Sequence, residues 1–167
     1  MKRQVRWFTL TLTASLALGA CAPAEQHTDK QMSTEHAEHE THGAGDQLEK
    51  TSAKTIAPAF LKETDESIQT IYLAVAKHQD LLEKMPCYCG CGETAGHTSN
   101  YDCFIADQTA AGETTWTTHG ITCGTCLDIA AQSIVAYQQE TPIKKIRQDI
   151  DAAYATTGVA PTKTPAL

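Results

Sequence analysis

The chain has 167 residues and a net charge of −7, with 41% hydrophobic and 6% aromatic residues. This length fits one domain with tails. The acidic balance argues against nucleic-acid binding and against binding to anionic lipid by charge alone, because both require basic patches. Six of the seven cysteines fall between residues 87 and 126. This clustering indicates that the stretch uses sulfur for a purpose.

Residues 1–20 have the pattern of a lipoprotein signal peptide. A positively charged start precedes a mostly apolar stretch that is too short to span a bilayer, and two small residues then precede Cys21. We predict that Cys21 carries the lipid anchor, palmitate included, and becomes the first residue of the mature protein. The alternative is an ordinary signal peptide with an incidental Cys21. The prediction places the protein at the cell membrane or outer membrane, on the extracytoplasmic side.

Residues 21–56 are predicted to form a disordered tether rich in histidine and glutamate, because they contain few large apolar side chains. His36, His39 and His42 are spaced by three residues. Histidine-rich tracts bind Cu(II), Zn(II) or Ni(II) weakly, so these three are candidate accessory ligands. A polar spacer that happens to contain histidines is the equal alternative.

The fold class expected for residues 57–157 is all-α, a small three-helix domain with a long Cys-rich loop. Apolar residues at helical spacing predict helices over about 58–84, 122–139 and 142–157. The segment between the first two helices contains many glycines and prolines and no sustained periodicity. A loop this long needs a stabilising device or a function. Residues 158–167 are predicted to be a flexible tail.

The cysteines at 87, 89 and 91 alternate along the chain. Neighbours in a Cys-x-Cys pair bridge each other poorly, since the ring would be strained, but they converge easily on metal ions. Thiolate-rich sites favour soft metals, and this spacing matches no common zinc pattern, so Cu(I) is the expected metal with Zn(II) as an alternative. The candidate ligands are Cys87, Cys89, Cys91, Cys103, Cys123, Cys126, His97 and His119.

Three segments together resemble the bacterial PCYCGC-motif (lipo)proteins. They are Pro86–Cys91, which reads PCYCGC, then Gly96–Phe104, and then His119–Ala130. The resemblance covers residues 57–157 and all six loop cysteines, and the lipoprotein start agrees with it. It implies that the loop is one unit, but it assigns no activity.

Three functions remain open from the sequence. The first is a membrane-anchored protein, not an enzyme, that captures, buffers or delivers a soft metal and passes it to a protein partner. The second is a structural or interaction module stapled by three disulfides, which an exported protein readily forms. The third is a thiol–disulfide oxidoreductase using Cys123 and Cys126, although no βαβ pattern surrounds them. The sequence does not fix the oligomeric state.

Overall fold

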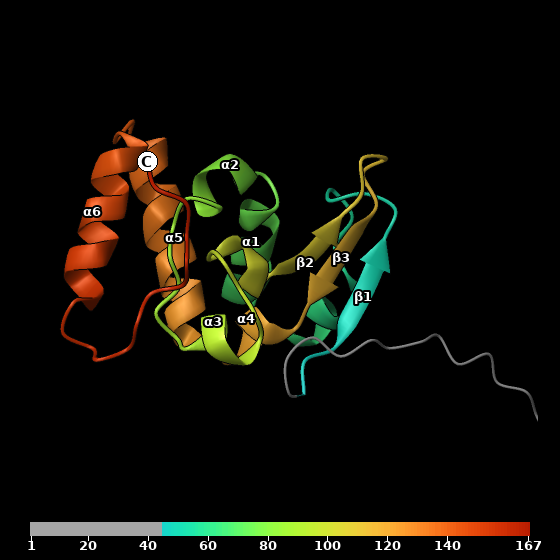
Figure 1. The fold of residues 1–167 in the computed structure, drawn as a ribbon. Helices are drawn as coiled ribbons and strands as arrows, with labels where there is room; N and C mark the ends of the chain where they lie inside the picture. The colour runs from blue at the N-terminus through green and yellow to red at the C-terminus, as the bar shows by residue number, and fades with distance from the viewer. Residues whose placement is uncertain (1–44) are drawn as a thin grey trace, which may run out of the picture. The chain divides into compact units, whose positions relative to one another are not determined.

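The computed structural model describes residues 45–167, which contain helices and one small sheet. The helices gather on one side of this part of the chain and the strands on the other (Figure 1). In chain order the elements are β1 (Leu48–Thr51), the 3-10 helix η1 (Ala59–Glu63), α1 (Glu66–Val75), α2 (Gln79–Leu82), α3 (Cys91–Thr94), the 3-10 helix η2 (Tyr101–Cys103), β2 (Ile105–Gln108), β3 (Thr114–Thr117), α4 (His119–Thr122), α5 (Gly124–Gln138) and α6 (Ile143–Tyr154).

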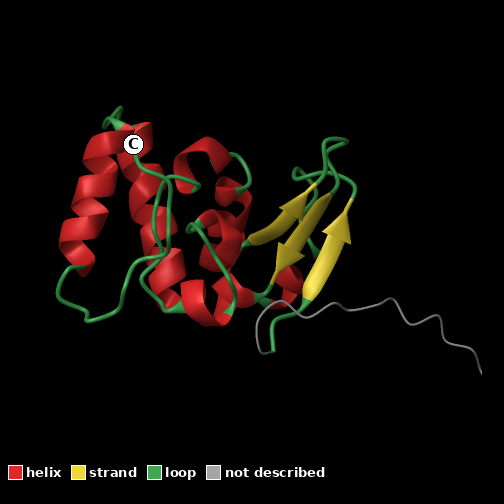
Figure 2. Ribbon diagram, in the orientation of Figure 1, coloured by secondary structure: helices red, strands yellow, loops and turns green. Residues whose placement is uncertain are grey.

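The sheet is antiparallel, with strand order β1-β3-β2 (Figure 2). Leu48 pairs with Thr117, and Ile105 pairs with Trp116. A register shift follows Ile105 in β2. The central strand β3 is buried along its whole length. The sheet therefore places His119, the second residue after β3 and the first of α4, at the boundary between the sheet and the helices.

The prediction of an all-α three-helix domain is wrong, because the described chain has mixed α/β content. β1 lies inside the segment predicted to be a disordered tether, and β2 and β3 lie inside the predicted loop. Each strand has only four residues, too few to display the alternation that identifies a strand. The sequence of β3, Thr-Thr-Trp-Thr, is typical of a strand, since it is wholly β-branched and aromatic.

One of the three predicted helices is divided. The predicted helix over 58–84 becomes η1, α1 and α2. The break before α2 occurs at His78, where ψ is 37° and the ring Nδ1 lies 2.8 Å from the carbonyl oxygen of Ala74. The predicted helix over 122–139 forms as α5, and the short α4 precedes it, separated by Cys123. α6 likewise forms as one helix within its predicted range of 142–157.

The core between the sheet and the helices is aromatic. The ring of Tyr72 contacts Phe104 edge-on, with centroids 4.9 Å apart, and lies 6.4 Å from Trp116. All three side chains are fully buried. The Tyr72 hydroxyl donates a hydrogen bond of 2.9 Å to the backbone oxygen of Thr117. We call Tyr72, Phe104 and Trp116 the aromatic region.

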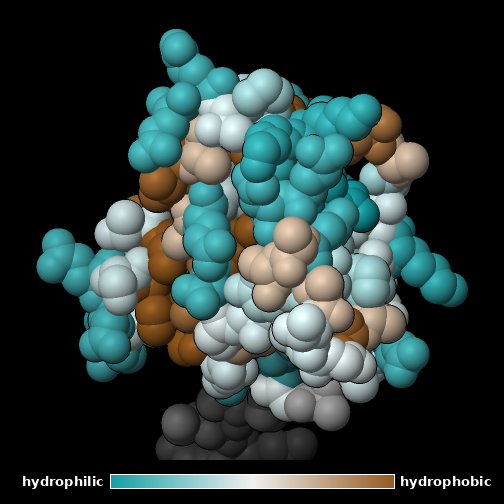
Figure 3. All heavy atoms as spheres, turned by 90° about the vertical axis from the view of Figure 1, so that its left-hand side faces the viewer, coloured by the Kyte–Doolittle hydropathy of each residue, from teal (hydrophilic) through white to brown (hydrophobic). Residues whose placement is uncertain are grey.

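The outer face of the helical side is formed around α6. Seen from this side, hydrophilic side chains cover much of the surface and leave a band of hydrophobic ones visible (Figure 3). Ile146 and Ile150 turn inward from α6 and are buried. Within residues 45–167, no helix has the length and apolar content that crossing a bilayer requires.

Candidate metal centre

The sulfur side chains come from four short segments that meet beside the aromatic region. Cys87 and Cys89 lie in the loop after α2, and Cys91 begins α3. Cys103 ends η2, and Cys126 lies in the first turn of α5. Two further ligand candidates lie just before α5: Cys123 is its N-cap, and His119 is the first residue of α4.

Two local features hold this loop in place. Gly90 has a φ of 85°, a left-handed conformation that glycine adopts without steric cost and that turns the chain between Cys89 and Cys91. The second feature is the buried Asn100, which forms two hydrogen bonds. Its backbone N–H donates to Met85, and its side-chain amide donates to the Cys126 carbonyl oxygen at 3.1 Å. Asn100 therefore ties the loop to the first turn of α5.

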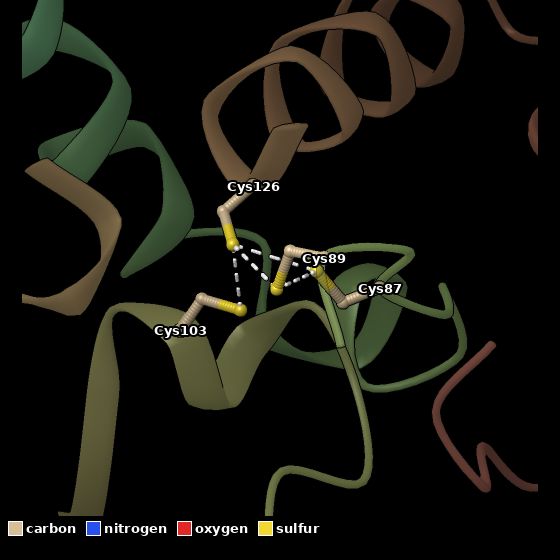
Figure 4. Close-up of side chains that lie close together, drawn as sticks. All are labelled: Cys87, Cys89, Cys103 and Cys126. Carbon is tan, nitrogen blue, oxygen red and sulfur yellow. Dashed lines mark hydrogen bonds between the residues drawn. The ribbon is translucent and has the colours of Figure 1, made fainter. Parts of the chain in front are cut away.

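Four sulfurs form a compact group. The Sγ of Cys126 lies 3.4 Å from that of Cys87, 3.6 Å from that of Cys89 and 3.1 Å from that of Cys103 (Figure 4). The Sγ atoms of Cys87 and Cys89 are 3.2 Å apart. Four sulfurs around one tetrahedral ion with bonds near 2.3 Å would be about 3.8 Å apart. The four observed distances are slightly shorter than this value, so a small outward movement of the sulfurs would reach that geometry.

The candidate ligands form three overlapping groups of four, and the ligand atoms within each group all lie within 4.8 Å of one another. The inner group is Cys87, Cys89, Cys103 and Cys126; the outer group is Cys89, His119, Cys123 and Cys126; the third group is Cys89, Cys91, Cys103 and His119. We call the six cysteines and His119 the sulfur cluster. Cys89 belongs to all three groups, so its sulfur is placed to bridge ions.

All six cysteines in the described part of the chain are free thiols. Their pKa values diverge because so many thiolates cannot be charged side by side. Hydrogen bonds from Cys103 first, and from Cys126 next, lower the pKa of Cys87 to about 4. The Cys103 bond is also the main reason that the pKa values of Cys89 and Cys91 are lowered.

The pKa values of the other three thiols, Cys103, Cys123 and Cys126, are raised. The bond with Cys103 is the main cause of the raised pKa of Cys126. For Cys103 and Cys123, the bond with Cys126 lowers the pKa, but bonds to neighbouring cysteines and burial outweigh it, and both values rise. The cluster thus contains three thiols whose pKa is lowered and three whose pKa is raised. A bound cation would remove this conflict by replacing the protons.

His119 is held between the sulfurs and a carboxylate. Its Nε2 lies 4.0 Å from Cys89 Sγ, and its Nδ1 lies 2.7 Å from the carboxylate of Asp46. Hydrogen bonding to Cys89 and Cys91, with a further contribution from Asp46, raises the pKa of His119 to about 11. A carboxylate on one ring nitrogen and a metal on the other is a common arrangement for ligating histidines.

His97 lies beside the sulfur cluster but belongs to none of its three ligand groups. The side chain is buried, its Nδ1 is 3.5 Å from Cys103 Sγ, and its ring meets that of His119 with centroids 4.7 Å apart. The predicted ligand His97 therefore contacts two candidate ligands, Cys103 and His119. The remaining predicted site residues, Cys21, His36, His39 and His42, lie outside the described residues.

Two residues at the site were not predicted. Asp46 contacts His119 across 73 positions of sequence. Thr162, in the predicted tail, is buried, and its backbone N–H and side-chain hydroxyl pair with the backbone oxygen and N–H of Cys87, both at 2.9 Å. A lone aspartate before a short strand and a threonine among prolines carry no local signal of such contacts.

The fold and the site together define a small α/β protein with a thiolate-rich, candidate metal-binding cluster. Residues 10–167 match the family described as protein of unknown function with PCYCGC motif, and the chain belongs to this family. No curated protein and no solved structure matches the chain.

Proposed function

We propose that this protein is an exported, lipid-anchored metal-binding protein that captures, buffers or delivers a soft metal ion, Cu(I), outside the cytoplasm. The observation that carries the proposal is the convergence of six thiols and one imidazole into three overlapping groups of four ligands. Thiols this close, with opposed pKa shifts, are poorly accommodated unless a cation joins them.

The donor set supports a soft metal. Sulfur ligands favour Cu(I), Zn(II) and iron–sulfur clusters over hard cations. Separate zinc sites would each need their own four ligands, whereas these groups share Cys89, Cys103, Cys126 and His119. Shared sulfurs suit a polynuclear centre. We assign it to Cu(I), because Cu(I) bound early would protect the thiols from oxidation outside the cytoplasm. Zn(II) is the second assignment.

The proposed location comes from the sequence before the described part of the chain. The charged and apolar start followed by Cys21 supports lipidation and anchoring in the cell or outer membrane. The histidines at 36, 39 and 42 would then raise the local concentration of metal near the cluster. A protein that holds a metal in this way needs a donor or acceptor protein, which we propose as its partner. No catalytic role is assigned.

The arrangement around Cys126 argues for metal binding over thiol–disulfide exchange. An attacking cysteine of an oxidoreductase is exposed and has a lowered pKa. Cys126 is fully buried, and three other sulfurs lie within 3.6 Å of its Sγ. The pKa of Cys123, the more exposed member of the pair, is raised. This pair is therefore part of a larger sulfur group and not an isolated redox couple.

The test is an anaerobic Cu(I) titration against a coloured Cu(I) chelator. The parent is the full chain with Cys21→Ser, which prevents lipidation and leaves the six cluster cysteines. The triple variant Cys87→Ser, Cys89→Ser and Cys91→Ser should lose Cu(I) binding, while His78→Asn, a histidine outside the cluster, should not. Unchanged Cu(I) affinity in the triple variant would overturn the proposal.

A further inference from the structure

The ligands of the sulfur cluster differ in their access to solvent. Cys87, Cys91, Cys103 and Cys126 are at most 1% exposed. The other three ligands, Cys89, His119 and Cys123, are only partly buried. The inner group contains one partly exposed ligand, Cys89, and the outer group contains all three. The cluster therefore has a covered side and one edge that reaches the surface.

The edge that reaches the surface, which we call the outer edge, is hydrogen-bonded to residues 46 and 47. The backbone N–H of Gln47 donates to the Thr118 hydroxyl at 2.9 Å, and the Thr118 N–H donates to the Gln47 carbonyl at 3.0 Å. This pair of bonds places Asp46 against His119, where both side chains are less than one fifth exposed. The carboxylate fixes Nδ1, so that Nε2 points toward Cys89.

The ligands of the outer edge also differ in chemistry from those of the inner group. The inner group is four sulfurs, while the outer group exchanges one sulfur for the His119 nitrogen. A soft ion prefers thiolate to imidazole, so His119 is the ligand that an incoming thiolate would displace most easily. Cys123 is the adjacent sulfur on the same edge and belongs to no other group.

We infer that the outer group, Cys89, His119, Cys123 and Cys126, is the exchange position of the cluster, and that the inner group retains metal. This inference rests on the proposed function. An incoming thiolate from a donor or acceptor replaces the His119 nitrogen, and then the Cys123 sulfur, on the ion. The metal keeps its oxidation state, no electrons move, and the displaced ligands stay on the protein. Asp46 acts as a positioning residue that keeps Nε2 of His119 directed at the ion.

Cys87 and Cys123 offer a matched pair for the test, because each belongs to a single group, the inner and the outer respectively. The full chain with Cys21→Ser is saturated with Cu(I) anaerobically and mixed with excess glutathione and a coloured Cu(I) chelator. Release should occur in a fast and a slow phase. Cys123→Ser should remove the fast phase and keep the slow one, whereas Cys87→Ser should keep the fast phase.

Asp46 provides a second measurement that does not alter a ligand. Asp46→Ala should weaken Cu(I) retention at the exchange position by about 10–100-fold, the usual effect of losing such a partner, with the slow phase unchanged. Asp46→Asn should restore most of the loss, because its amide oxygen still accepts from Nδ1–H.

The outcomes separate the two proposals. If the parent binds no Cu(I), the proposed function fails and this inference fails with it. If the parent binds Cu(I) but releases it in one phase, or if Cys87→Ser and Cys123→Ser remove the fast phase equally, the division into exchange and retention positions is wrong. An Asp46→Ala variant that alters both phases alike would contradict the positioning role.

Discussion

The aromatic region and the sulfur cluster lie side by side in one core, yet they are stabilised by different means. Tyr72, Phe104 and Trp116 are fully buried apolar surfaces that contact one another, and burial alone favours their folded arrangement. The cluster buries Cys87 and Cys126 just as completely, but its sulfurs have conflicting pKa shifts. The aromatic region is a complete hydrophobic core, whereas the side chains of the sulfur cluster could hold a cation.

Metal removal should therefore affect the two regions unequally. With free Cu(I) about 1,000 times above its dissociation constant, binding adds about 4 kcal/mol to the free energy of unfolding, which chelation removes. Hydrogen exchange should then accelerate more in residues 87–104, through local opening, than in β3, which exchanges through global unfolding. Thermal unfolding and amide exchange, with and without chelator, measure both effects. Equal acceleration in the two regions would contradict the distinction.

Gly120 joins the two regions, and its substitution should be the most damaging single change in that contact. A Cβ at this position would lie 2.7 Å from the Phe104 ring and 2.9 Å from the Tyr72 hydroxyl. Gly120→Ala should lower the free energy of unfolding by about 3 kcal/mol and also weaken metal binding, since His119 is its neighbour. Gly124→Ala is the control, because a Cβ there meets nothing within 4 Å. Equal urea midpoints for the two variants would refute this account.

Tyr72→Phe should act on the aromatic region alone. The substitution removes the hydroxyl that donates to Thr117 and leaves that buried carbonyl without this bond, at a cost of about 1–2 kcal/mol. Because no cluster ligand bonds to this hydroxyl within residues 45–167, Cu(I) stoichiometry should stay the same. Chemical denaturation of the metal-free protein and a Cu(I) titration separate the two readouts. A lower stoichiometry would show that the regions are coupled more tightly than we expect.

The smallest effect is expected where Tyr88, in the loop between Cys87 and Cys89, contacts α6. The Tyr88 hydroxyl donates to Asp151 at 2.8 Å, and its ring stacks on Tyr154. Tyr88→Phe keeps the stacking and should cost about 0.5–1 kcal/mol of unfolding free energy without changing the metal content. A double-mutant cycle with Asp151→Ala, which removes the acceptor, measures the pair directly. Strict additivity of the two variants would mean that the bond contributes nothing.

The sequence predicted the sulfur side of this comparison far better than the sheet side. Alternating cysteines and a Cys-x-x-Cys pair indicate candidate ligands, because sulfur side chains are themselves ligands of soft metals. The pattern of α6 was equally readable, since Ile146 and Ile150 repeat at helical spacing. The sheet was missed because its register depends on contacts between β1 and β3, such as Leu48 with Thr117, that no local pattern encodes.

Contacts over long sequence distances also explain what was missed at the site. Asp46 becomes part of the centre only when β1 pairs with β3, and Thr162 reaches Cys87 only after α6 returns the chain to the loop. Neither residue type is unusual in its own surroundings. The sequence therefore indicated which side chains could bind metal, while the fold is needed to see which residues orient them.

The most direct test of the central claim is to measure metal content and free thiols on one sample. The full chain with Cys21→Ser would be purified anaerobically from copper-supplemented cells. We predict more than one copper ion per chain, with the six cluster thiols unreactive until a chelator is added. A metal-free protein with no free thiols and a mass lowered by six hydrogens would mean three disulfides and would contradict the account.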